Sequence, residues 1–580
     1  MPFRPLVPDP DKGIGEPALD GNLIIHGDNL HALKSLLPLY AGKVDCVFID
    51  PPYNTGHEGW CYNDNVNAPM IREWLDANPV GEDDGLRHDK WCAMMWPRLR
   101  LLHELLSETG LLFWTVDDNE QHHARMMLED MFGPGCFLAT ISWVKRYTRS
   151  NNANLFYSMK DHLLVYRRST AVEEIKEPRT DAADEGYANP DNDPRGPWIT
   201  SSYVNPATKE KRKNLTYAIH RPGTEESVEH PTHAWKYSTA EHARHVAENR
   251  LWWGADGSAE YPRLKLYLAE ARSMVPVDVW NWQDVGSSDD GSAIVKRIFG
   301  RSVFDNPKPI GLVQKAISLI ENREAVVLDS FAGSGTTAHA VLEANRRDSG
   351  CRKFILVEGE DYADSLTAER IRRVSQGYSY QGKQRTELLR EKITWTKLKS
   401  ANKTLGQVEK IENLYGHEYD AITKTVKDGE LIVTGENVIT DRVEGLGGNF
   451  TYCTLGDPIE LDNLLTGKTL PPWDQLGAVL FHIATSRTAT PLLQREADYY
   501  VGEADGQHVW LIYKPDLEWL KTSDAALTLS RASEIAAHDP DARHLVFAPA
   551  RYVSQKMLAE RGIPVEFAPL PFALYRVDRS

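Results

Sequence analysis

The segment Asp50-Pro51-Pro52-Tyr53 has the residue types and the spacing to hold a planar amino group. It follows the apolar run 44–49, which is typical of a buried strand. Pro51 pushes Asp50 into an extended conformation, and neither proline has an N–H that could enter a helix. The Asp50 carboxylate and a proline carbonyl are then two acceptors for one –NH2 group, and the Tyr53 ring can stack on its flat face. Two such hydrogen bonds would pull the nitrogen toward tetrahedral geometry and prepare it to attack an electrophile. The alternative is a rigid turn without a chemical role.

A second segment, far along the chain, has the pattern of a nucleotide-like ligand site. The apolar stretch 324–329 is followed by the glycine turn 330–337 and then by a predicted helix over 338–344. Such a strand–turn–helix unit lets the backbone approach a ligand closely. The turn lacks both a third glycine and a Gly-Lys-Ser/Thr, which disfavours a pyrophosphate. The next predicted strand, 354–357, ends in Glu358, which is placed to bind two ribose hydroxyls. A glycine turn alone is more often structural, but its combination with Glu358 and the 50–53 segment favours chemistry.

Together these segments resemble S-adenosylmethionine-dependent methyltransferases that modify adenine N6 in DNA. The catalytic segment precedes the cofactor turn, which is the order of the β class. The resemblance is strongest to the Mod (modification) subunits of Type III restriction–modification systems and their stand-alone relatives. It covers about two-thirds of the chain well and the last third loosely. The segments that carry it are 25–30, 48–56, 161–166, 262–265, 304–309, 331–337 and 368–374.

The resemblance implies a role for each matching residue. The target amine would be held by Asp50, Pro51, Pro52 and Tyr53. S-adenosylmethionine would be bound by Asp28, Lys308, Asp329, Phe331, Gly333, Gly335, Thr336 and Glu358. Among these, Asp329 matches a position that meets the cofactor's amino group, Glu358 the ribose-binding acid, Asp28 an acid near the adenine, and Lys308 a motif that closes over the carboxylate. The neighbouring Gly359-Glu360 leaves the register of the ribose-binding acid open, and Lys308 also reads as a turn lysine.

Composition agrees with a multidomain enzyme of the cytoplasm. The chain has 580 residues, of which 41% are hydrophobic and 26% charged, which is ordinary for a globular protein of two to four domains. No apolar run approaches the roughly 20 residues of a membrane span, and the N-terminus lacks a signal peptide's apolar core. The six cysteines form no C-x-x-C pair, which argues for a reducing compartment and against a metal site. We therefore expect a cytoplasmic location, no metal and no membrane.

The formal net charge of −17 is unusual for a protein that binds DNA, because phosphate contacts require Lys and Arg. The basic charge must be local. Two clusters interleaved with aromatic residues are predicted to contact DNA, although such clusters are more often solvated surface. Their members are Lys145, Arg146 and Arg149, and Lys211, Arg212 and Lys213.

The predicted fold class is α/β, with a Rossmann-like methyltransferase sheet, an inserted target-recognition region and a separate C-terminal α/β module. The expected boundaries are a catalytic half (1–168), the insertion (169–300), a cofactor half (301–380), a helical connector (381–415) and the C-terminal domain (416–580). The catalytic and cofactor segments should meet at the carboxyl ends of neighbouring strands, where open α/β sheets bind ligands. His508 and His544 in the last domain are expected to be isolated structural residues.

The predicted function is transfer of a methyl group from S-adenosylmethionine to adenine N6 in double-stranded DNA, as the modification subunit of a restriction–modification or related defence system. Alternatives are methylation of cytosine N4, for which Ser-Pro-Pro-Tyr is commoner, of RNA or of a protein glutamine, or an inactive DNA-binding scaffold. Expected partners are DNA, a second copy of the chain and a restriction subunit with helicase and nuclease activity. The recognition sequence, and whether the enzyme acts in a restriction system or alone, are not encoded in any motif.

Overall fold

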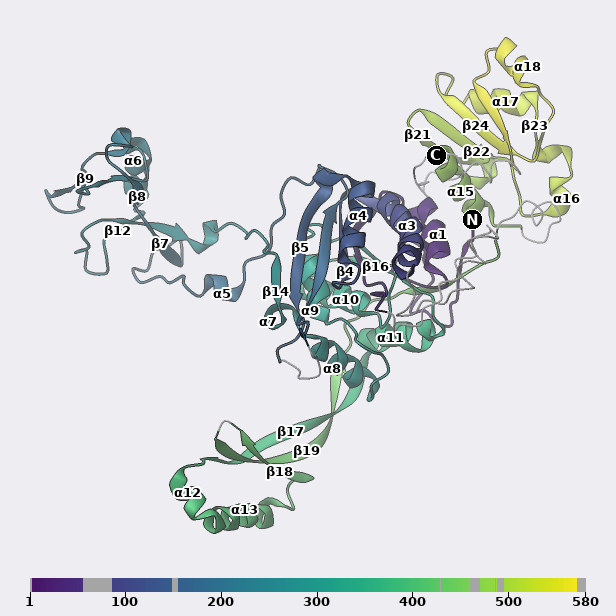
Figure 1. Ribbon diagram of the computed structural model, residues 1–580. Helices are drawn as coiled ribbons and strands as arrows, with labels where there is room; N and C mark the ends of the chain where they lie inside the picture. The colour runs from purple at the N-terminus through teal and green to yellow at the C-terminus, as the bar shows by residue number, and fades with distance from the viewer. Residues whose placement is uncertain are drawn as a thin grey trace. The chain divides into compact units, whose positions relative to one another are not determined.

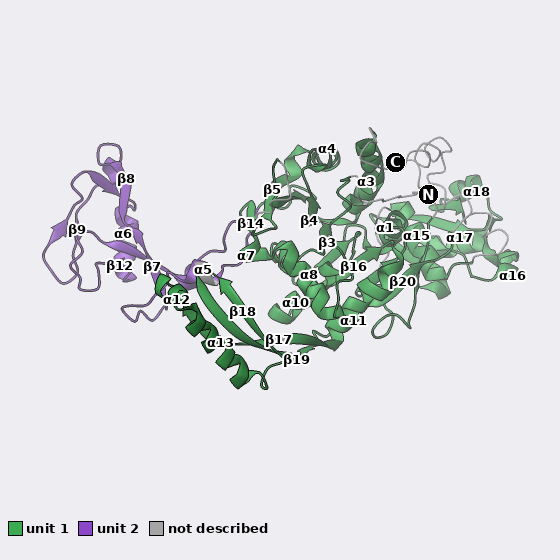
Figure 2. Ribbon diagram, turned by 60° about the horizontal axis from the view of Figure 1, so that its bottom comes forward, with its two compact units in different colours: residues 1–173, 277–580 green, residues 174–276 purple. Residues whose placement is uncertain are grey.

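The computed structural model describes residues 3–55, 86–148, 155–427, 429–458, 470–485, 487 and 495–570. The chain forms two compact units, Met1–Glu173 with Val277–Ser580, and Glu174–Pro276 (Figure 2). The predicted recognition insertion thus ends near residue 276 rather than 300. Residues 277–300 join the first unit because their large apolar side chains, including Trp280 and Ile298, are buried there.

The first unit is built on a ten-stranded sheet (Figure 1). Its strands, in spatial order, are β1 (Leu6–Pro8), β20 (Thr451–Leu455), β2 (Leu23–His26), β16 (Lys353–Glu358), β15 (Val326–Asp329), β3 (Val44–Ile49), β4 (Leu106–Val116), β6 (Lys160–Arg167), β5 (Phe137–Val144) and β14 (Val279–Asn281). The six strands from β20 to β4 are parallel to one another, whereas β6 runs antiparallel to both its neighbours. The predicted α/β class is confirmed.

Helices cover both faces of this sheet because its central strands are apolar on both sides. Alternate residues such as Leu23, Ile25 and Val47 belong to one core with α1 (Asn29–Tyr40), α3 (Arg87–Leu105) and α4 (Gln121–Phe132). The intervening Ile24 and Phe48 are equally buried. Helices that pack with one another or on β3, β15 and β16 are α7 (Trp282–Val285), α8 (Ser288–Phe299), α9 (Ile310–Ser318), α10 (Thr336–Asp348) and α11 (Glu369–Gln376). Within the described residues, no helix has both the length and the apolar character needed to cross a bilayer.

The segment predicted as a helical connector (381–415) is helical only from residue 395 onward. Residues 377–392 form the long strand β17 (Gly377–Lys392), which pairs antiparallel with β19 (Glu430–Glu444), and β18 (Ala421–Lys427) completes a three-stranded ribbon. The helices of this segment are α12 (Trp395–Lys399) and α13 (Ala401–Tyr415) (Figure 1). High helix propensity was outweighed here by pairing with a partner strand about 50 residues away, which a local pattern does not reveal.

The C-terminal α/β module begins later than predicted, because β20 belongs to the central sheet. Its sheet contains β21 (Tyr500–Ala504), β22 (Gln507–Leu511), β24 (Arg543–Ala548) and β26 (Val565–Pro569), as the sequence predicted. Its remaining elements are α15 (Trp473–Thr485), α16 (Leu517–Leu520), β23 (Ala526–Leu527), α17 (Leu529–Ala536), β25 (Ala550–Arg551) and α18 (Gln555–Glu560). His508 and His544 are not isolated, since their rings stack with centroids 5.1 Å apart on paired strands.

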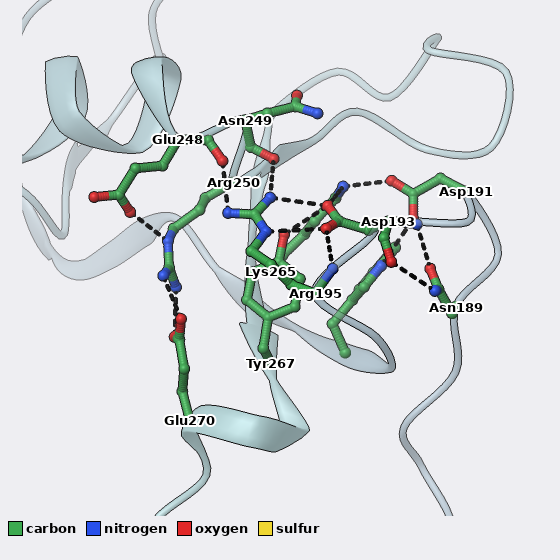
Figure 3. Close-up of polar contacts among 11 residues, drawn as sticks. Asn189, Asp191, Asp193, Arg195, Glu248, Asn249, Arg250, Lys265, Tyr267 and Glu270 are labelled. Atoms are coloured by element: carbon green, nitrogen blue, oxygen red, sulfur yellow. Dashed lines mark hydrogen bonds and ion pairs between the residues drawn. The ribbon is translucent and has the colours of Figure 1, made fainter.

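The second unit is held by short strands and a buried ionic network. Its elements are α5 (Asp181–Asp184), β7 (Trp198–Ser202), β8 (Val204–Thr208), β9 (Ile219–His220), β10 (Ser227–Val228), β11 (His233–Trp235), α6 (Thr239–Ala247), β12 (Leu251–Trp252) and β13 (Arg263–Tyr267). Lys265 is only 1% exposed, and its Nζ lies 3.1 Å from Asp193 Oδ2 (Figure 3). The same carboxylate accepts hydrogen bonds from Arg195 at 2.8 Å and from the Tyr267 hydroxyl at 2.8 Å. This network fastens the loop around residue 193 to β13.

Asp193→Ala is expected to destabilise the second unit by about 3–5 kcal/mol, because it leaves buried cationic groups without one carboxylate. Urea unfolding and limited proteolysis within residues 174–276 would measure the loss. Glu225→Ala, which removes an exposed carboxylate from the same unit, is the matched control. Equal unfolding of the two variants would show that the network contributes little to stability.

Candidate active site

The 50–53 segment and the glycine turn 330–337 follow neighbouring strands of the central sheet, at the carboxyl ends of those strands. Strands β3 and β15 are parallel neighbours, with Val327 opposite Cys46 and Leu328 opposite Val47. From β15 the chain continues through α10 to β16 on one side, whereas from β3 it continues through α3 to β4 on the other. The boundary between β15 and β3 is therefore the point where the winding of the sheet reverses, and such points bind ligands in open α/β folds.

Both oxygens of the Asp50 carboxylate are engaged by side chains from other elements. Oδ1 accepts a short hydrogen bond from the Thr115 hydroxyl on β4. Oδ2 lies 2.5 Å from Lys308 Nζ, which comes from the loop before α9. These contacts fix the plane of the carboxylate at the carboxyl end of β3. In this structure the ammonium of Lys308 lies on Asp50, and its expected role at the cofactor's carboxylate stays a prediction.

The two prolines differ in what their carbonyls contact. The Pro52 carbonyl accepts a hydrogen bond from Trp91 Nε1 on α3, at 2.8 Å. Among the residues that the structure describes, no donor contacts the Pro51 carbonyl, which leaves it as the acceptor for a target amine. Pro52 therefore supports the segment from α3, which differs from the predicted direct role.

Tyr53 is oriented by a second charged pair. Its hydroxyl lies 3.4 Å from Asp161 Oδ2, and the other oxygen of Asp161 lies 2.6 Å from Lys145 Nζ. Burial, together with the negative charges of Asp50 and Asp161, raises the pKa of Tyr53 well above its ordinary value. The ring therefore stays neutral and suited to stacking on a flat ligand.

The glycine turn is tightly packed, which explains its composition. Gly333 has φ +49°, and a Cβ there would lie 3.0 Å from the Phe304 ring. Its carbonyl accepts from the Thr367 hydroxyl at 2.6 Å. Gly335, with φ +79°, precedes the first residue of α10. Substituting either glycine would strain the backbone in the left-handed region.

Glu358 and the glycine turn are connected directly. Gly333 N donates to Glu358 Oε2 at 2.7 Å, and Glu360 N donates to Oε1 at 3.0 Å. Glu358 is buried, whereas Glu360 is exposed, so Glu358 is the acid whose carboxylate contacts the glycine turn. Each carboxylate oxygen keeps a lone pair for a further donor. A small cleft of about 400 Å³, lined by Phe304, Tyr362 and their neighbours, adjoins this turn.

Asp28 lies at the end of β2, beside Glu358 on β16. Gly27 N donates to the Glu358 carbonyl at 2.9 Å, so the two strand ends are adjacent. Asp28 caps α1 by accepting from His31 N at 3.1 Å, and it lies 3.6 Å from Arg98 Nη2. Its local contacts account for its position without a ligand, and its predicted role near an adenine ring stays a prediction.

Thr336 and Phe331 both make contacts that hold the glycine turn in place. The Thr336 hydroxyl donates to the Lys308 carbonyl at 3.2 Å and accepts from Arg370 Nη1 at 3.0 Å. The Phe331 ring packs against the core beneath the sheet edge. Thr336 thus ties the cofactor turn to the loop that carries Lys308.

Asp329 is the most perturbed carboxyl in this region. It is 4% exposed and accepts from the Thr337 hydroxyl at 2.6 Å and from Phe331 N at 3.0 Å. Burial, reinforced by the charges of Asp50 and Glu358, raises the pKa of Asp329 to about 7. Because this value lies above that of the unfolded chain, the free energy of unfolding falls as pH rises from about 4 to about 7.

If Asp329 pairs with a ligand ammonium, as the resemblance implies, affinity for S-adenosylhomocysteine should rise with pH. We expect an increase approaching tenfold per unit between pH 5.5 and 7, because only the ionised carboxylate attracts the ammonium. Calorimetric titration would measure it, and Asp329→Asn should flatten the dependence. An equally steep rise in the variant would assign the effect to another group.

A cluster that the sequence did not signal lies next to the catalytic segment. The side chains of His88, Glu120 and His123 place three ligand atoms within 4.8 Å of one another, a spacing that a metal ion requires. Glu120 is fully buried and accepts from His88 at 2.6 Å, from His123 at 2.8 Å and from Asn54. These hydrogen bonds already satisfy the carboxylate, and they anchor Asn54 directly after Tyr53. The three residues were invisible to spacing arguments because the segment 89–119 separates them.

The predicted DNA-binding residues divide into different environments. Lys145 forms an ion pair with Asp161, near Tyr53. Arg146 is exposed and contacts the Tyr157 hydroxyl. Arg149 lies outside the described residues. Lys211, Arg212 and Lys213 are exposed in a turn of the second unit. Their exposure suits phosphate contacts, and it does not distinguish these residues from ordinary surface.

Several residues that position the site were missed by sequence reasoning. Arg370 is fully buried and donates to the Ser334 hydroxyl at 2.9 Å and to Thr336. Thr115, Trp91 and Asp161 hold the catalytic segment as described above. Arg370 lies in a segment that carried the family resemblance, but its contact with the turn could not be inferred without the fold.

Comparisons with known proteins agree with this geometry. A family model described as DNA methylase matches residues 44–369. The StyLTI Mod subunit of a Type III restriction-modification enzyme from Salmonella typhimurium is 32% identical over 400 residues, covering 64% of this chain and 59% of that protein. The EcoPI Mod subunit from Escherichia phage P1 is 27% identical, covering 73% and 69%. The Type II methyltransferase M.KpnI from Klebsiella pneumoniae is 28% identical, covering 57% and 79%. The match thus spans about three-fifths of the StyLTI relative.

Proposed function

Because the chain belongs to the DNA methylase family, we propose that it transfers a methyl group from S-adenosylmethionine to adenine N6 in double-stranded DNA. The observation that carries this proposal is the position of Asp50 and the Pro51 carbonyl beside the glycine turn, at the reversal point of the sheet. The acceptor segment and the donor turn can then face one bound pair of reactants.

The residues around the turn fit S-adenosylmethionine. The missing Cβ of Gly333 gives room beside Phe304, Glu358 offers oxygens to ribose hydroxyls, and Asp329 offers a carboxylate to an ammonium. When bound, the cofactor supplies a methyl group on a positively charged sulfur. The turn has neither the third glycine nor the Gly-Lys-Ser/Thr of pyrophosphate-binding loops, which favours this nucleoside over a dinucleotide.

The target amine is positioned by the catalytic segment. One amine hydrogen is donated to Asp50 and the other to the Pro51 carbonyl, while Tyr53 stacks on the base. Thr115 holds Asp50 in the required orientation. A base reaches this position only after it leaves the duplex, which costs a few kcal/mol of stacking and pairing.

Asp50 is also placed to accept the proton that the reaction releases. As the nitrogen–carbon bond forms, the carbon–sulfur bond breaks, and the nitrogen must give up one hydrogen as a proton. The Asp50 carboxylate, which already accepts a hydrogen bond from that N–H group, takes the proton and passes it to water. Most of the rate acceleration then comes from orientation and local electrostatics.

Adenine N6 and cytosine N4 are both exocyclic amines, and the Asp-Pro-Pro-Tyr segment favours adenine. Methylation-aware sequencing of DNA from cells that express the protein would report the base, the atom and the recognition site together. N4-methylcytosine instead of N6-methyladenine would assign the other amine, and unmodified DNA would redirect the search to RNA or a protein glutamine.

The second unit is the proposed target-recognition region, with Lys211, Arg212 and Lys213 as candidate phosphate contacts. Arg146 is a further candidate on the first unit. Loss of DNA affinity at all sequences on substituting the three residues of the turn would support a phosphate-binding role.

Assembly with a restriction subunit is proposed because two relatives are described as Mod subunits of Type III restriction-modification enzymes, and assembly with a second copy stays a prediction. The C-terminal module and the β17–β19 ribbon are the parts available for such contacts. A cytoplasmic location, where bacterial DNA lies, follows from the same proposal. The alternative of an inactive DNA-binding scaffold would be supported by failure to bind S-adenosylmethionine in a calorimetric titration.

A further inference from the structure

Lys308 occupies the place that a target base needs. Its Nζ lies 2.5 Å from Asp50 Oδ2, the oxygen available for an amine since Oδ1 is bonded to Thr115. The same ammonium lies 5.1 Å from the centre of the Tyr53 ring, over its face. One cation therefore lies on both the acceptor and the stacking surface, and a flipped base must compete with the ammonium for them.

The backbone of Lys308 is fixed, so that only its side chain is free to move. Lys308 lies between Pro307 and Pro309, which restrict the chain, and its carbonyl accepts from Thr336 of the cofactor turn. Pro307 packs so closely on α8 that a Cβ at Gly291 would lie 2.0 Å from its carbonyl oxygen. A long, flexible side chain on this rigid base can swing between Asp50 and an anion in the cofactor turn.

We propose that Lys308 is a gate that couples the two binding steps: the carboxylate of S-adenosylmethionine draws the ammonium from Asp50 and so opens the base pocket. The inference rests on the proposed function and adds an order of binding to it. Cofactor binding must then precede stable capture of the base, and the carboxylate of the cofactor is the part that triggers it. By linkage, removal of Asp50 should not weaken cofactor binding, because Lys308 loses its competing partner.

The gate can be tested with a duplex that keeps adenine at the modified position found by sequencing and carries 2-aminopurine directly beside it. Base capture raises its fluorescence, and affinity is measured without ligand, with S-adenosylhomocysteine, and with 5′-methylthioadenosine, which lacks the carboxylate. For the native chain we expect at least about tenfold tighter capture with S-adenosylhomocysteine only. Lys308→Gln should capture the base equally, within about twofold, in all three conditions.

Lys296→Gln, which removes an exposed lysine from α8, is the matched charge control and should behave as the native chain. Calorimetry adds a second readout: Lys308→Gln should weaken S-adenosylhomocysteine and leave 5′-methylthioadenosine unchanged. The gate is overturned if the native chain captures the base equally with and without ligand, or if Lys308→Gln keeps the native dependence on ligand. It is also overturned if Lys308→Gln weakens capture in every condition, because Lys308 would then be a positioning residue for Asp50. No fluorescence change in any condition, with every variant folded, would instead refute the proposed function, and the gate with it.

Discussion

Asp50→Ala is expected to lower the rate of methyl transfer by at least three orders of magnitude while leaving affinity for S-adenosylmethionine undiminished. The substitution removes the acceptor that orients the amine and receives its proton, and such groups contribute on the order of 10²–10³ or more each. Transfer of a labelled methyl group to DNA would measure the rate, and calorimetry the cofactor affinity.

Asp130→Ala, on the exposed side of α4, is a suitable control because it removes the same charge far from the site. Asp50→Asn separates charge from shape, since the amide keeps one acceptor oxygen but cannot take the proton. Near-native turnover by Asp50→Ala would remove this residue from the chemistry. A loss of cofactor affinity equal to the loss of rate would mean that the variant has disturbed the glycine turn.

Glu358→Ala should weaken S-adenosylmethionine binding by roughly 30- to 100-fold. It removes the carboxylate that would accept from the ribose, the net contribution of one charge-assisted hydrogen bond being about 1.5–3 kcal/mol, and it leaves Gly333 N without its acceptor. The loss should appear in the dissociation constant, and at saturating cofactor the rate should largely recover.

Glu360→Ala is the matched control, because Glu360 is the neighbouring acid that the sequence could not distinguish from Glu358. Its side chain is exposed, so we expect a change below about twofold. A larger effect for Glu360→Ala than for Glu358→Ala would shift the ribose site by two residues. Equal small effects would move the ribose to another part of the sheet edge.

The structure shows contacts of two predicted residues that the sequence did not reveal. Lys308 was predicted to bind the cofactor, and its ammonium also contacts the Asp50 carboxylate. Pro52 was grouped with the amine-binding residues, yet its carbonyl is held by Trp91. In both cases the loop was identified from sequence, whereas the partner comes from an element that is remote along the chain. A side chain's role depends on that partner.

What the sequence determined by itself was the local chemistry. Strand, proline and glycine patterns depend on backbone sterics and on the period of burial, which act within a few residues. They located Asp50, Tyr53, the glycine turn and Glu358, and they predicted the α/β class, which the structure confirms.

Only the tertiary structure decided which distant residues meet. The pairing of β3 with β15 brings together segments more than 270 residues apart, and the long strand β17 forms from a helix-prone stretch because β19 offers it a partner. The Glu120 cluster, the Lys265 network and the contact of Lys308 with Asp50 arise in the same way. Burial and charge pairing are properties of the folded chain. Residues that pair across such distances produce no pattern among the residues next to them in the sequence, so a local reading does not find them.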